Sequence, residues 1–91
     1  MLWEVKFTIM IYRVFKIVNY ADTCRDADDI RITELGYKNS LDDAKSVAND
    51  YIKKYFFHKD TELRKCKDGS FSATDFRPYG ATMKIQPIKV D

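Results

Sequence analysis

The chain has 91 residues, of which 45% are hydrophobic and 33% charged, and its formal net charge is +2. A chain this short has room for one hydrophobic core, so we expect a single compact domain spanning residues 1–91. The apolar content excludes a disordered chain, and the small net charge does not by itself mark a nucleic-acid-binding protein.

No stretch of the sequence resembles a signal peptide or a membrane span. The most apolar run, Phe7 to Val18, contains Arg13 and Lys16 and is too short to cross a bilayer. Cys24 and Cys66 are isolated from each other, whereas small secreted domains usually carry several closely spaced cysteines. We therefore expect a cytoplasmic protein with reduced thiols and no membrane partner.

Residues Leu2 to Tyr20 are predicted to form β structure, because they are rich in branched and aromatic side chains and apolar at alternate positions. A straight strand of nineteen residues would span roughly 63 Å, whereas a domain of this size has a radius of gyration of about 12 Å. We expect this segment to bend, to break at a bulge or to project. Residues 21–29 are polar and predict a loop. Ile30 to Tyr37 predicts a second strand, with a bulge or strand end at Gly36.

The sequence predicts a helix from Ser40 to about Phe57. Ser40 is a good N-cap residue, and Asp43 stands at the third helical position, as in a weak capping box. Apolar residues recur at three- and four-residue spacing along one stripe: Leu41, Ala44, Val47, Ala48, Tyr51, Ile52, Tyr55 and Phe56.

Residues Glu62 to Phe76 predict a β-hairpin. Asp68 and Gly69 are typical of a two-residue turn with positive φ angles, which would pair Lys67 with Ser70.

Residues 77–80 predict a further turn, and Ala81 to Val90 a last strand, whose Pro87 favours a sheet edge or a bulge. The element order is therefore β-β-α-β-β-β. This order indicates an α+β fold, a mostly antiparallel sheet of about five strands with one amphipathic helix packed on one face. The order of the strands within the sheet stays open.

Nothing in the sequence indicates catalysis, a metal site or a cofactor. The single histidine, His58, follows the predicted helix, and the chain has no glycine-rich phosphate loop or catalytic signature. The spacing of His58, Cys24 and Cys66 matches no zinc site, and the acidic residues 22–28 lack the glycine and glutamate of a calcium loop. We expect a protein that is not an enzyme and holds no cofactor.

The predicted first strand carries apolar side chains on both of its faces. One helix covers one face of a sheet, and an uncovered face should be polar. We assign the even positions Met10, Tyr12 and Val14 to the uncovered face and predict a protein interface there. The alternative is that the sheet curls and buries both faces itself.

A second possibility is contact with nucleic acid or another anion. The central part of the chain is acidic and the C-terminal part basic. Basic residues with interleaved aromatic residues favour single strands or RNA, although Tyr55 and Phe56 belong to the predicted core stripe and nearby acids dilute the charge. The basic residues of this segment are Lys53, Lys54, Lys59, Arg64, Lys65 and Lys67.

A third possibility is a groove for a small anionic ligand such as a nucleotide, beside Tyr37 and Tyr79, which flank predicted turns. Tyrosines in such places more often close the edge of a core with the hydroxyl group in water.

These features favour a small non-enzymatic binding protein, a regulator or inhibitor that occupies the surface of a protein partner or forms a homo-oligomer. Short length, an excess of Asp over Glu and the lack of catalytic motifs are typical of accessory proteins of phages and mobile elements, including those that counter host defence. The sequence resembles no family that we can name.

Overall fold

A computed structural model of the chain describes residues 9–19, 30–75 and 81–90. Its elements, in chain order, are β1 (Ile9–Asn19), β2 (Ile30–Lys38), α1 (Leu41–Tyr55), β3 (Arg64–Lys65), β4 (Phe71–Thr74) and β5 (Ala81–Val90). The α+β class and the order β-β-α-β-β-β are confirmed. The predictions for residues 2–8, 20–29 and 76–80 lie outside the described residues.

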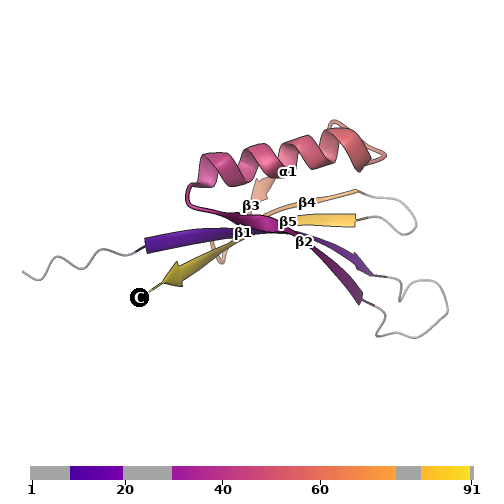
Figure 1. Ribbon diagram of the computed structural model, residues 1–91. Coiled ribbons are helices and arrows are strands. Elements are labelled where there is room, and N and C mark those ends of the chain that lie inside the picture. The colour runs from indigo at the N-terminus through magenta and orange to yellow at the C-terminus, as the bar shows by residue number, and fades with distance from the viewer. Residues whose placement is uncertain (1–8, 20–29, 76–80, 91) are drawn as a thin grey trace, which may run out of the picture.

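The strands form one five-stranded antiparallel sheet in the order β2-β1-β5-β4-β3. The two longest neighbours, β1 and β5, come from opposite ends of the chain and form the centre of the sheet. Figure 1 shows α1 lying along one face of this sheet. Within the described residues, no element lies on the other face.

The hydrophobic core lies between α1 and the sheet. Alanines at positions 44 and 48 let the helix backbone approach the strands closely, and both are fully buried. The sheet contributes a row of side chains that directly face one another across β1, β5 and β4. The core consists of Val14, Ala44, Ala48, Ile52, Phe56, Ala73, Met83 and Ile85.

The helix begins and ends where local chemistry can satisfy its free backbone groups. The Ser40 hydroxyl accepts a hydrogen bond from the Asp43 amide at 3.1 Å, which confirms the predicted N-cap. At the other end, Lys59 Nζ donates to the carbonyl of Lys53 at 2.7 Å and to that of Lys54 at 3.3 Å. Its positive charge also lies near the negative end of the helix dipole.

Strand β2 contains the predicted bulge. Val14 pairs with Gly36 but the next residue, Phe15, pairs with Glu34, so Leu35 has no partner in β1. Gly36 has a φ of 137°, a conformation that L side chains rarely adopt. The extra residue changes the phase of β2, and Leu35 packs against the core.

The predicted two-residue turn at the hairpin is wrong by one residue. The Cys66 amide donates to the Ser70 carbonyl at 2.7 Å and the Gly69 amide to the Cys66 carbonyl at 3.1 Å, so Lys67 lies in the loop instead of pairing with Ser70. The Asp68 carboxylate accepts bonds from the Ser70 amide at 2.9 Å and hydroxyl at 2.6 Å. Gly69 alone takes the positive φ, 88°, as in three-residue hairpin loops.

Strand β5 lies between β1 and β4, and its pairing with β1 continues through Pro87 without a shift. The prediction of a sheet edge or a bulge at Pro87 is therefore wrong. The Asp75 amide donates to the Ala81 carbonyl, so odd-numbered residues of β5 direct their backbone groups toward β4. The nitrogen of Pro87 therefore faces the region beyond the end of β4. The Pro87 ring lies near Gly69 there, with its Cγ 4.0 Å from the point where a Cβ atom on Gly69 would stand. No ladder hydrogen bond to β1 is lost, although Pro87 stands opposite Tyr12.

Candidate functional site

The structure reverses the assignment of the two faces of β1. Val14, predicted at an interface, is fully buried beneath α1, and Tyr12 packs against the same core. Met10 shares their face, because side chains alternate along a strand. Lys16, on this face as well, places its ammonium group 5.4 Å from the ring centre of Tyr51 on α1. The prediction that these even positions form an exposed surface is wrong.

The packing partners of β1 determine which of its two faces is buried. Val14 stands opposite Ile85, and Met83 follows on the same face of β5, so this side offers α1 a continuous apolar surface. Arg13 occupies the other face. A lone arginine among apolar odd positions is the sequence signal that identifies the exposed face, because a guanidinium is almost never buried without a partner.

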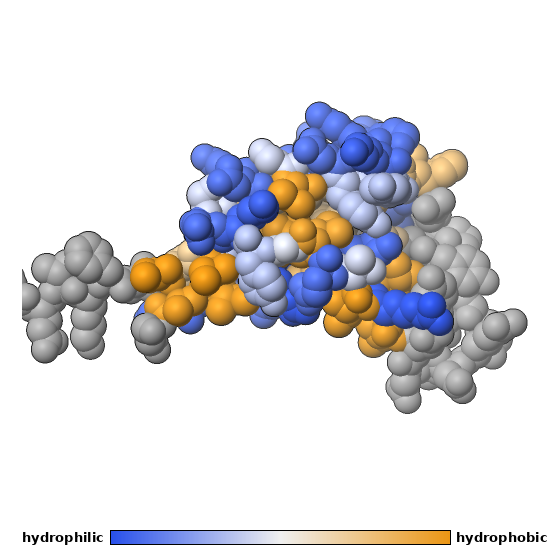
Figure 2. Space-filling model, in the orientation of Figure 1, coloured by the Kyte–Doolittle hydropathy of each residue, from blue (hydrophilic) through white to orange (hydrophobic). Residues whose placement is uncertain are grey.

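We call the uncovered side of the sheet the open sheet face. It carries two groups of apolar side chains, one shared by β1 and β5 and the other by β1 and β2. Ile9 is 57% exposed in the first group, and Ile30 and Ile32 are 54% and 52% exposed in the second. Figure 2 shows two apolar areas along the lower side of the molecule with hydrophilic residues between them. The first group comprises Ile9, Ile11, Ile88 and Val90, and the second Ile17, Ile30 and Ile32.

A polar network separates the two groups. Arg13 Nε lies 2.9 and 3.0 Å from the two carboxylate oxygens of Glu34, and Arg13 Nη1 donates to Gln86 at 3.4 Å. The guanidinium also covers the Phe15 ring, 4.1 Å from its centre. The hydrogen bond from Arg13 lowers the pKa of Glu34 below its usual value, and the same bond raises the pKa of Arg13.

The predicted basic segment is spread over several elements. Lys53 and Lys54 are exposed on the last turn of α1, and Lys59 caps that turn. The remaining members belong to the hairpin: Arg64 and Lys65 form β3 and Lys67 lies in the loop.

The aromatic residues of this region differ from the prediction. Phe56 belongs to the core as expected, but Tyr55 is 62% exposed and its neighbour Phe57 is 67% exposed. The Tyr55 ring contacts the Tyr51 ring at an angle of 40°, with ring centres 4.6 Å apart. The exposed rings therefore stand beside the exposed lysines at the end of α1.

The predicted ligand groove beside two tyrosines stays a prediction. Tyr37 is exposed on the open sheet face, opposite Arg13 on β1. Tyr79 lies outside the described residues.

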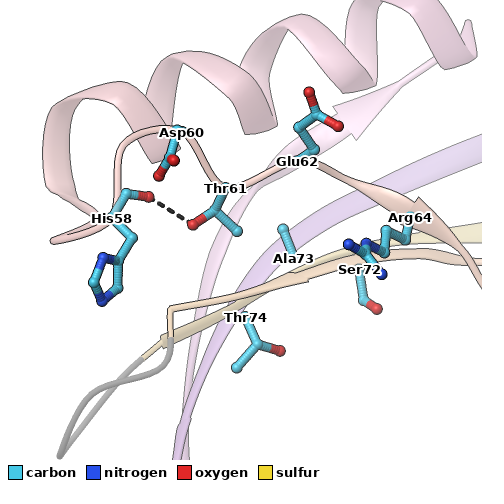
Figure 3. A pocket seen from close by; sticks show the side chains of 8 residues that line it. All are labelled: His58, Asp60, Thr61, Glu62, Arg64, Ser72, Ala73 and Thr74. Carbon is cyan, nitrogen blue, oxygen red and sulfur yellow. Dashed lines mark hydrogen bonds between the residues drawn. The ribbon is translucent and has the colours of Figure 1, made fainter.

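Sequence reasoning missed a pocket of about 440 Å³ at the edge of the sheet. It lies between β4 and the connection that leads from α1 to β3 (Figure 3). Its volume falls within the range of small-ligand clefts. The lining residues are His58, Asp60, Thr61, Glu62, Arg64, Ser72, Ala73 and Thr74.

A buried carboxylate fixes one wall of this pocket. Asp75 is buried, and its carboxylate accepts hydrogen bonds from the amides of Phe57 at 2.7 Å and His58 at 3.3 Å. The Thr61 hydroxyl and amide both donate to the His58 carbonyl, at 2.6 and 3.2 Å, which closes a turn. The wall therefore has a defined shape without a ligand.

Metal-ligating side chains, the Cys66 thiol and the character of α1 add no further candidate site in the described residues. Within the described ranges, no cluster of three or more His, Cys, Asp or Glu side chains could hold a metal ion. The Cys66 thiol lies 3.3 Å from the Ser72 hydroxyl. The helix of the described chain, α1, is neither long nor apolar enough to span a membrane.

Comparison with protein-family models, with curated proteins and with solved structures found no match to this chain. Any proposal about function therefore depends on the geometry of this chain alone.

Proposed function

We propose that this protein is a non-enzymatic binding protein that acts by covering the surface of a protein partner through its open sheet face. The observation that supports the proposal is the pair of exposed apolar groups on that face, led by Ile9 and Ile32. The solvated face of an antiparallel sheet normally carries polar side chains. Exposed apolar patches with polar surroundings are typical of protein interfaces.

The polar network gives such a contact its specificity. Arg13 and Glu34 form a charge-assisted pair between the apolar groups. A partner that buries the isoleucines must also supply hydrogen-bonding groups opposite this pair, because an unsatisfied buried polar group is costly. This requirement limits the apolar surfaces that the protein can bind. Such selectivity is expected of a regulator or an inhibitor.

The test compares one double variant with a matched control. In I9D/I32D a carboxylate replaces one exposed isoleucine of each apolar group, whereas Tyr55→Ser removes an equally exposed side chain from the end of α1. Wild type and both variants are immobilised for quantitative capture from the native host, and each is examined for self-association by light scattering. We expect I9D/I32D alone to lose its partner or its second copy. Equal retention by all three proteins contradicts the proposal.

A second candidate function, binding of single-stranded nucleic acid, is favoured by the exposed rings of Tyr55 and Phe57 beside Lys53 and Lys54. Bases stack on exposed aromatic rings, and lysines attract phosphates in a salt-dependent way. Fluorescence polarisation with a labelled oligouridylate at low salt tests it. Here Tyr55→Ser should weaken binding and I9D/I32D should not, which reverses the roles of the two variants. No binding at low salt removes this candidate.

A further inference from the structure

The edge pocket exists because the ladder between β3 and β4 opens. Arg64 pairs with Ser72, so continuation of the same register would place Glu62 opposite Thr74. Instead, Asp75 holds the amide of His58. The β4 chain advances three residues from Ser72 to Asp75, while the opposite segment runs six residues from His58 to Arg64. The surplus residues bow away from β4 and leave the pocket (Figure 3).

Thr74 directs its backbone amide and carbonyl into this opening. In an antiparallel ladder the backbone groups of successive residues point alternately to the two neighbouring strands. The amide of Asp75 points to Ala81 of β5, so Thr74 points the other way. Ser72, two residues earlier, uses the same side to pair with Arg64. Among the described residues, no strand partner stands opposite Thr74 on this side.

The charges that line the pocket favour an uncharged ligand. Arg64 and Asp60 contribute opposite charges, and Figure 3 shows Glu62 pointing away from β4. The Thr61 hydroxyl is already engaged with the His58 carbonyl. What remains available on the β4 side is a hydrogen-bond donor and an acceptor of the main chain at Thr74. Their natural complement is one residue of an extended peptide, whose amide and carbonyl point to the same side of its strand.

We propose that the edge pocket binds a short extended peptide segment, which adds to β4 beside Thr74 and replaces the missing part of the β3 ladder. Main-chain hydrogen bonds to an exposed sheet edge supply the affinity in this mode of recognition. The wall opposite β4 is held by Asp75 and by the His58–Thr61 turn, so little ordering is needed when the peptide enters. This site is separate from the open sheet face and does not depend on the function proposed for it.

The probe is a blocked pentapeptide of alternating threonine and valine, titrated into ¹⁵N-labelled protein. We expect the amide signals of Thr74 and of its pocket neighbours Ala73 and Thr61 to shift. The same peptide N-methylated at every residue keeps its side chains but has no amide donors, and it should cause no shift at the same concentration. Binding of the N-methylated peptide with equal affinity overturns the proposal, as do shifts confined to β2, the strand at the opposite end of the sheet order.

Variants of one residue test the backbone contact directly. Thr74→Pro removes the amide directed into the pocket but no backbone hydrogen bond to β5, and proline is tolerated on such a strand edge. It also removes the contact between the Thr74 and Thr82 hydroxyls, which Thr74→Val removes as well. Loss of the one bond from the Thr74 amide should weaken peptide binding about tenfold. Thr74→Val keeps the amide and should bind like the wild type. Unchanged affinity of a folded Thr74→Pro protein contradicts the proposal, and if this variant does not fold, the N-methylated peptide decides the question.

The I9D/I32D variant should bind the pentapeptide like the wild type, because its changes lie on the open sheet face. Failure of the peptide site is thereby distinguished from failure of the proposed function. Loss of peptide binding in I9D/I32D counts against the edge pocket as the binding site.

Discussion

Substitution of Asp75 tests how the end of α1 is attached to the sheet. The carboxylate is buried at the end of β4 and accepts the amides of Phe57 and His58, the two residues that follow the C-cap of α1. It thereby ties the end of the helix to the sheet. In Asp75→Ala both amides lose this acceptor in a partly buried place.

The expected loss of stability follows from these two bonds. A buried donor left without an acceptor costs about 1–3 kcal/mol. For two amides we expect a loss of about 3 kcal/mol in the free energy of unfolding, a large share of the roughly 5–14 kcal/mol available to a domain of this size. The midpoint of thermal unfolding should fall by about 12–24 °C.

Urea denaturation followed by circular dichroism measures this loss. Asp60→Ala is the matched control, because it removes an exposed carboxylate from the same connection and should change the stability by less than about 0.5 kcal/mol. Asp75→Asn keeps one acceptor oxygen and should fall between the two. A loss below about 1 kcal/mol in Asp75→Ala would refute the view that this carboxylate anchors the helix end.

Three further outcomes are expected. Ile52→Ala, at the buried centre of α1, should lower the free energy of unfolding by about 2–5 kcal/mol, measured in urea against exposed Ser46→Ala as the control. Ser40→Ala removes the N-cap acceptor and should cost about 1 kcal/mol in the same assay, and an unchanged midpoint would contradict the cap. Glu34, whose folded pKa lies below its ordinary 4.5, stabilises the fold above that pH, and this contribution is lost as the pH falls through the folded pKa. Glu34→Gln should therefore flatten the stability profile in the acid range below about pH 5, and an identical slope in both proteins would contradict the Arg13 pair.

Local features of the chain could be predicted because neighbouring residues decide them. The helix boundaries follow from the Ser40 cap and from an apolar stripe whose period is that of an α-helix. The bulge in β2 follows from a change of phase beside a glycine. The bounds of β5, Ala81–Val90, match the prediction for the same reason.

The hairpin register and the covered face of β1 were predicted incorrectly. In each case the same sequence pattern is compatible with two arrangements, either two registers or two faces. Asp68 and Gly69 suit a two-residue turn, but in the three-residue loop that forms, the Asp68 carboxylate accepts two bonds from Ser70. Both faces of β1 are apolar, and the face that α1 covers is the one on which Val14 stands opposite Ile85.

The sequence by itself determined the type and order of the elements and the position of the helix, since short-range hydrogen bonding and periodicity fix these. Only the tertiary structure decided which isoleucines are exposed and where the sheet edge opens. Those features depend on pairing between residues far apart in the chain, such as Asp75 with His58 and Arg13 with Glu34. Alternation along a strand gives two faces, and only the packing partner determines which of them is covered.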